Sequence, residues 1–222
     1  MRYYPAFLDV RGQRCLVVGG GAVAARKARA LVAAGAMVRV VAPEISRELR
    51  RAAGLECRQA RYSARQLRGV WLVVAATDDP LVQQAVWRDA ARRGLLCNVA
   101  DVPARSNFIV PAVVRRGELQ IAVSTGGGSP ALARRLRREV EKSVGREYAA
   151  LLELLRALRP RVMAEVPAPE RPRVFSAMVD SAALDLLRAG RRRDARRLLE
   201  GFIHHAGGEV RVSGRNPRAR SG

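Results

Sequence analysis

The chain has 222 residues, of which 49% are hydrophobic and 27% charged, a composition typical of a soluble globular protein. No apolar stretch reaches the roughly 20 residues that a membrane helix needs, and the first residues lack the apolar core of a signal peptide. We therefore expect a cytoplasmic protein without a membrane partner. Cys15, Cys57 and Cys97 are odd in number and widely spaced, which argues against a disulfide framework or a metal site and favours buried, inert thiols.

The formal net charge of +21 is almost entirely arginine, because only Lys27 and Lys142 among the 41 basic residues are lysine. A polyanionic partner such as nucleic acid, phosphate or a many-carboxylate ligand would explain this charge. A genome rich in arginine codons, in which arginine occupies ordinary solvent-exposed helix positions, would explain this net charge equally well. Aromatic residues are only 5% of the chain and no recognition motif is present, so we expect no nucleic-acid partner.

The first half of the chain alternates short apolar runs with helical patterns. This rhythm is typical of an α/β fold with a Rossmann-type, doubly wound parallel sheet. Glycines at 35 and 94 mark the ends of the first and last of these helices. The predicted strands cover residues 14–18, 37–41, 56–59, 70–75 and 95–99, and the predicted helices begin after residue 21, at 45 and at 80.

Around Phe108 the rhythm changes to two strands, 108–114 and 119–124, followed by a helix that begins at Pro130. The rest is helical, with Pro160, the 167–172 stretch and Gly190 between the predicted helices 148–158, 172–187 and 193–205. We therefore predict three parts and a tail. They are a nucleotide-binding domain at 1–112, a small α+β module at 113–145, a helical C-terminal domain at 146–206, and a disordered tail at 207–222.

The run Gly19-Gly20-Gly21-Ala22-Val23-Ala24 fits the dinucleotide fingerprint G-x-G-x-x-A. Gly19 would permit the tight turn, and Gly21 would let the backbone approach a pyrophosphate. The N–H groups of the following helix would then face the phosphates. A glycine turn without a ligand is the alternative, and the position between a strand and a helix disfavours it.

The ribose end of this predicted cofactor site is less regular. An acidic residue normally ends the second strand, whereas Glu44 here follows Pro43 just past the strand tip. Arg39 and Arg47 could instead accommodate a 2′-phosphate. We favour NAD over NADP.

Asp101, in the segment Asn98-Val99-Ala100-Asp101, leaves the carboxyl end of a predicted strand, where an open parallel sheet binds its ligand. A carboxylate there can accept a proton during an oxidation. Taken alone, Asp101 fits a turn or capping aspartate better than a catalytic base. Asp78 and Asp79 precede Pro80 as capping residues do, and Thr77 is expected to line the nicotinamide side of the cleft.

A second glycine run, Ser124-Thr125-Gly126-Gly127-Gly128-Ser129-Pro130, also leads into a helix. Its N–H groups and hydroxyls would suit carboxylates or phosphates of a substrate. A flexible loop with Ser129 as the cap and Pro130 as the first helical residue is the simpler alternative.

Together these motifs resemble the precorrin-2 dehydrogenase family, the sirohydrochlorin-forming module of siroheme synthases. The similarity extends over residues 3–145 in consistent order. It rests on the two glycine runs continued through Ala28 and Arg134, and on Tyr4-Pro5-Ala6-Phe7-Leu8, Ala75-Ala76-Thr77-Asp78-Asp79, Cys97-Asn98-Val99-Ala100-Asp101 and Phe108-Ile109-Val110-Pro111.

The resemblance implies NAD-dependent oxidation of precorrin-2, an anionic tetrapyrrole with eight carboxylates, to sirohydrochlorin in siroheme biosynthesis. It also implies a homodimer formed through residues 113–145, with an active site shared between subunits. The family's catalytic aspartate falls on Asp101, and its cofactor positions fall on Ala22-Val23 and Pro43-Glu44. We expect Asn98 and the loop 124–129 to bind substrate. Thr125 stands where some relatives phosphorylate a serine, which leaves such regulation in doubt.

Two alternatives stay open. Some relatives also insert Fe2+ or Co2+ into the product, a reaction in which Asp101 could again serve as the base. We expect no resident metal, because no Cys/His cluster is present and the adjacent His204 and His205 point about 100° apart on a helix. A non-catalytic NAD-sensing module would explain the first domain but would leave Asp101 and the second glycine run without a role.

Overall fold

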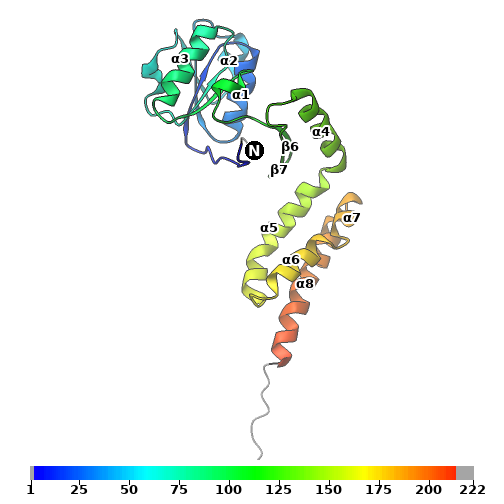
Figure 1. The fold of residues 1–222 in the computed structure, drawn as a ribbon. Coiled ribbons are helices and arrows are strands. Elements are labelled where there is room, and N and C mark those ends of the chain that lie inside the picture. The colour runs from blue at the N-terminus through cyan, green and yellow to red at the C-terminus, as the bar shows by residue number, and fades with distance from the viewer. Residues whose placement is uncertain (1–2, 214–222) are drawn as a thin grey trace, which may run out of the picture. The chain divides into compact units, whose positions relative to one another are not determined.

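The computed structural model describes residues 3–213, with side chains for residues 3–206. The chain forms two compact units (Figure 1). The first comprises the residues up to Pro111 together with Thr125–Pro130, and the second comprises Ala112–Ser124 and the residues from Ala131 onward. No helix of the described part is long and apolar enough to cross a membrane.

The first unit is built on five parallel strands in the order β3-β2-β1-β4-β5 in the described chain, which confirms the predicted Rossmann-type sheet. The order reverses between β1 and β4, so the ligand crevice of such a sheet lies outside the carboxyl ends of these two strands. The strands are β1 (Arg14–Val18), β2 (Met37–Ala42), β3 (Leu55–Gln59), β4 (Leu72–Ala75) and β5 (Leu96–Val99). The helices are α1 (Ala22–Ala33), α2 (Arg47–Arg51) and α3 (Pro80–Ala91), and the short 3-10 turns are η1 (Ala64–Leu67) and η2 (Pro103–Arg105).

Both faces of this sheet are covered, which is why its strands are almost continuously apolar. Val17 packs on one face with Ala24 and Ala28 of α1. Its neighbour Leu16 points to the other face, where it packs in one cluster with Val86 of α3. Leu16 is fully buried, and burial of such a side chain contributes about 1.5–3 kcal/mol.

Two predicted elements in the first half of the chain need correction. The helix expected from Ile45 to Ala53 is only α2, because Ser46 caps its start by accepting a hydrogen bond from the Leu49 amide. The strand expected from Phe108 begins only at Ala112, in β6. The preceding residues instead lie against β5, where the Asn98 side chain donates to the Phe108 carbonyl over 3.1 Å.

The second unit consists of an antiparallel hairpin and a set of helices (Figure 1). The helices pack around a separate core in which Leu158, Met178, Leu199 and Ile203 are almost fully buried. The elements are β6 (Ala112–Arg116), β7 (Leu119–Val123), α4 (Pro130–Ser143), α5 (Glu147–Glu165), α6 (Arg171–Val179), α7 (Ala183–Arg188) and α8 (Arg192–Ser213).

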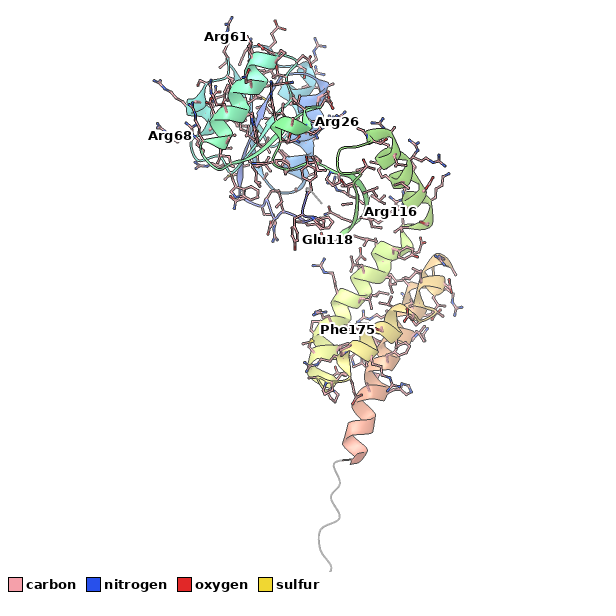
Figure 2. The ribbon with its side chains drawn as sticks, viewed as in Figure 1. Arg26, Arg61, Arg68, Arg116, Glu118 and Phe175 are labelled. Atoms are coloured by element: carbon pink, nitrogen blue, oxygen red, sulfur yellow. The ribbon has the colours of Figure 1, made fainter. Side chains whose placement is uncertain are left out.

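The hairpin is tied to the helices by two charged side chains near its turn (Figure 2). Arg116 donates to the backbone carbonyls of Glu141 and Val144, each over 3.1 Å, at the end of α4. Glu118 accepts from Arg156 of α5 over 3.0 Å. The turn is shorter than the predicted 115–118, because β6 continues to Arg116 and β7 begins at Leu119. Gly117, in this turn, adopts a positive φ of 58°.

The helical part also differs from the prediction at three points. Pro160 lies inside α5 instead of ending it. A proline removes one hydrogen bond from a helix, but the core contacts of α5 on both sides of Pro160 hold the helix together. The single helix predicted over 172–187 is split at Ser181, whose hydroxyl donates to the Met178 carbonyl. Helix α8 continues to Ser213, although disorder was expected from residue 207. The remaining tail, 214–222, lies outside the described residues.

Candidate cofactor and substrate site

The first glycine loop is wedged between the carboxyl ends of β2 and β4. Gly19 has a φ of 137°, and its amide donates to the Val41 carbonyl over 2.9 Å. A Cβ built on Gly19 would lie 2.0 Å from the Ala76 carbonyl oxygen, which no side chain could tolerate. Gly19 therefore satisfies both a backbone conformation and a contact that require glycine.

The third glycine of the loop differs from the first two. A Cβ built on Gly20 would meet the Glu44 carbonyl oxygen at 1.7 Å, whereas a Cβ on Gly21 would have nothing within 4 Å. Gly21 precedes α1 as its N-cap and gives the helix no side-chain cap, so the first amides of Ala22 and Val23 are left for another acceptor. Open space beside an uncapped helix N-terminus fits a pyrophosphate.

The exposed residues Pro43 and Glu44 follow β2 directly, at the edge where the ribose of a dinucleotide would lie. Arg39 is paired with Glu56 of the neighbouring β3 over 2.9 Å, so its guanidinium is already engaged by a carboxylate. This hydrogen bond holds the pKa of the Glu56 carboxyl below its usual value. Arg47 is exposed at the first residue of α2. Of the two arginines considered for a 2′-phosphate, Arg39 is thus engaged by Glu56, whereas Arg47 is exposed.

The loop after β4 is ordered by its own side chains. Asp79 caps α3 by accepting from the amides of Leu81 and Val82, over 2.8 and 3.3 Å, as its sequence position predicts. The Thr77 hydroxyl accepts from the Asp79 amide over 3.3 Å, and the Thr77 carbonyl accepts from Gln83 over 2.7 Å. Thr77 is half-buried in this turn. The prediction that it lines the nicotinamide side stays a prediction.

Asp101 combines an unusual backbone with an exposed carboxylate. Its φ is 59°, the one positive value among the non-glycine residues of the described chain. Aspartate enters this region at a cost of order 1 kcal/mol, and such residues concentrate at functional sites. The side chain is exposed at the carboxyl end of β5, next to the sheet's crevice.

The second glycine loop lies beside the loop that carries Asp101. A Cβ built on Gly127 would contact the Pro103 ring at 3.8 Å. The loop is closed on itself, because the Thr125 hydroxyl donates to the Ser129 carbonyl and accepts from the Ser129 amide, over 3.0 and 3.1 Å. Gly126 has a φ of 62°. Ser124 belongs to the other unit, so only the part from Thr125 onward is shown near Asp101.

Two residues that hold the Asp101 loop were missed in the sequence. The buried Ser106 hydroxyl accepts from the Val99 amide over 3.0 Å and bonds to the Val102 carbonyl over 3.2 Å. The Asn107 side chain accepts from the Cys97 amide over 2.8 Å. Both side chains therefore accept hydrogen bonds from backbone amides of β5 that a neighbouring strand would otherwise accept. Asn98, predicted to bind substrate, is 8% exposed and is bonded to Phe108 in the same arrangement.

A third missed residue is Lys27, which lies half-buried on α1. Burial and the neighbouring Arg26 lower the pKa of its ammonium, and the attraction of the Asp101 carboxylate partly opposes this shift. The charges of Lys27 and Asp101 thus interact although the two residues lie far apart in the sequence. The rarity of lysine in this chain was the available signal.

Comparison with known proteins gives consistent matches along the chain. Residues 6–112 match an NAD(P)-binding family, residues 116–143 the central region of sirohaem biosynthesis proteins, and residues 147–201 the dimerisation region of sirohaem synthases. A siroheme synthase from Nitrosococcus oceani is 37% identical over 98% of this chain and 48% of its own length. One from Azotobacter vinelandii is 41% identical over the same shares.

Among solved structures, SirC, a precorrin-2 dehydrogenase, superposes with a TM-score of 0.75 and 26% identity. The match covers 90% of this chain and 100% of that one. The chain spans about half the length of the curated siroheme synthases that it matches. The likeness to SirC extends across both units and is therefore not limited to the nucleotide-binding fold.

Proposed function

Because the chain belongs to the siroheme-synthase family and carries its NAD(P)-binding, central and dimerisation regions in order, we propose that it oxidises precorrin-2 to sirohydrochlorin with NAD. The observation that carries this proposal is the exposed Asp101, held at a positive φ beside both the sheet's crevice and the second glycine loop.

The residues of the first loop fit the cofactor. Gly21 offers the space for a pyrophosphate, and the free amides at the start of α1, from Ala22 and Val23, would donate to it. Glu44 would accept from the ribose hydroxyls. When bound, NAD would accept a hydride from the substrate.

The substrate half of the site is assigned to Asp101 and to the loop 125–129. Oxidation of precorrin-2 releases one hydride and one proton, and the Asp101 carboxylate would accept that proton. The backbone amide of Gly127 would receive a substrate carboxylate. Asn98 and Ser106 would support the site indirectly, because their side-chain hydrogen bonds hold the backbone next to Asp101 in place.

We also infer that the chain forms a homodimer. Besides the matched dimerisation region, α4 presents an apolar face on which Leu132 is 47% and Leu136 is 38% exposed. A second copy would remove this surface from water. Leu136→Glu should then shift the mass measured by light scattering from dimer toward monomer. An unchanged mass would place the interface elsewhere.

The proposed reaction can be tested by absorbance with precorrin-2 and NAD. Asp101→Asn is the preferred variant, because asparagine tolerates a positive φ and so removes the charge without straining the backbone. We expect its turnover to fall by at least about 10³-fold, within the range for loss of a general base, while NAD affinity stays within twofold.

Asp9→Asn is the matched control, since Asp9 is an exposed aspartate that pairs with Arg11 before β1, at the amino end of the strands. A near-normal rate in Asp101→Asn would contradict the assignment of the base. NAD binding by the native chain without any reaction on precorrin-2 would support the NAD-sensing alternative.

A further inference from the structure

The first turns of α8 and the middle of α5 form a hollow of about 680 Å³, a size within the range of ligand pockets. All of its lining residues belong to the second unit. Its walls are held in place, because α5 and α8 pack on one core that buries Leu154 and Leu199. Half of the lining residues are arginines, namely Arg191, Arg192, Arg193, Arg196 and Arg197.

The spacing of these arginines concentrates their charge. Arg193 precedes Arg196 and Arg197 by three and four positions on α8, so the three side chains share one face of the helix. Like charges at this spacing repel each other and destabilise a helix. An anion between them would relieve this repulsion.

One carboxylate in the hollow is shared by two of its arginines. Asp194 accepts a hydrogen bond from Arg191 over 2.8 Å and another from Arg197. These hydrogen bonds hold the pKa of the Asp194 carboxyl below its usual value, so it is charged at neutral pH. One negative charge between two guanidinium groups leaves one positive charge in excess.

Arg193 supplies a second positive charge in excess. Arg192 and Arg196 each have a carboxylate, because they donate to Glu153 and Glu200 over 2.8 and 2.9 Å. Arg193 is exposed and has no ion pair within residues 3–206, the part of the chain whose side chains the structure describes. The hollow therefore combines the volume of a ligand pocket with positive charge that its own carboxylates leave unbalanced.

We propose that this hollow binds an organic anion with two or more carboxylates. A guanidinium presents two parallel N–H donors that match the two oxygens of a carboxylate, and two such groups would balance the charge in excess. Leu154 and Ala157 add an apolar part of the wall, against which the carbon body of the ligand would lie. The residues of this site take no part in the proposed oxidation, so the two proposals can fail separately.

Calorimetric titration of the full chain with citrate, a compact tricarboxylate, tests this site. Saturating NAD is added so that the first glycine loop is occupied. In Arg193→Gln we expect the affinity for citrate to fall about tenfold or more, the size expected for loss of a hydrogen bond between charged groups. Arg173→Gln is the matched control, because Arg173 of α6 is also exposed and has no ion pair among the described side chains. Its affinity for citrate should change less than about twofold.

Ala157→Glu fills the hollow without removing an arginine. Ala157 is exposed on α5, and glutamate is a good helix former, so the fold should tolerate the change. The added carboxylate would take the place of the ligand. We expect citrate binding to be lost while the mass from light scattering and the midpoint of urea unfolding stay those of the native chain. A changed mass would show that copies of the chain meet at this hollow, and would overturn the proposal.

Three further results would contradict the proposal. Arg193→Gln could bind citrate as tightly as the native chain does, or Arg173→Gln could lose as much affinity, which would reveal an effect of net charge alone. Inorganic phosphate could bind more tightly than citrate, which would exclude the assignment to an organic anion. A native chain that oxidises precorrin-2 but does not bind citrate would contradict this inference alone. Citrate binding through Arg193 without oxidation of precorrin-2 would contradict only the proposed function.

Discussion

Gly20 lies directly against the backbone of Glu44, so that a Cβ at position 20 would stand 1.7 Å from the Glu44 carbonyl oxygen. The Gly20 carbonyl in turn accepts from the Ser46 amide over 3.0 Å. We expect Gly20→Ala to force this segment away and to lower the free energy of unfolding by about 1–3 kcal/mol, as overpacking does. Urea unfolding measures the loss, and an unchanged midpoint would show that the two loops separate freely.

Gly21→Ala should have the opposite signature. Its Cβ would meet nothing within 4 Å, and its φ of −91° suits any residue, so stability should stay within about 0.5 kcal/mol of the native chain. The added methyl group would instead fill the space assigned to the pyrophosphate. We expect the Kd for NAD, measured by calorimetry, to rise about tenfold or more, equivalent to 1.4 kcal/mol. Normal NAD affinity would move the cofactor away from this glycine.

Local patterns in the sequence predicted the elements of the first unit well, because each buried strand and each glycine turn leaves its own signal. Side-chain hydrogen bonds between segments that are not neighbours in the sequence leave no such signal. Ser106 and Asn107 bond to β5 with side chains, so their segment carries no strand periodicity although a strand was expected from Phe108. Pro160 predicts the end of a helix, but α5 continues through it because its side chains pack in the core on both sides. The electrostatic interaction of Lys27 with Asp101 joins segments far apart in the sequence and arises only on folding.

Ser106→Ala tests how far the Asp101 loop depends on this edge of the sheet. The variant leaves the Val99 amide without its hydrogen-bond acceptor in a buried position. We expect the free energy of unfolding to fall by about 1–3 kcal/mol, the cost of an unsatisfied buried group. Because Val99 and Val102 flank Asp101, kcat for precorrin-2 should fall as well, while the Kd for NAD stays constant. A loss of stability with an unchanged kcat would show that the loop holds Asp101 without Ser106.

Lys27→Met should make the chain without ligands more stable, since the ammonium is half-buried and its pKa is lowered mainly by that burial. The folded chain then releases this proton more readily than the unfolded chain, whose lysine pKa is about 10.4. The native lysine therefore costs stability in full below its lowered folded-state pKa. This cost shrinks as pH rises toward 10.4 and is absent above it.

The difference in unfolding free energy between Lys27→Met and the native chain should accordingly be positive at pH 7 and should diminish toward pH 10. Denaturant unfolding at several pH values measures it, with Lys142→Met as the control for an exposed lysine. A variant less stable than the native chain at pH 7 would mean that Lys27 supports the fold. A more stable variant at pH 7 is the result expected of an ammonium that folding removes partly from water without a contacting carboxylate, because burial then disfavours its charged form.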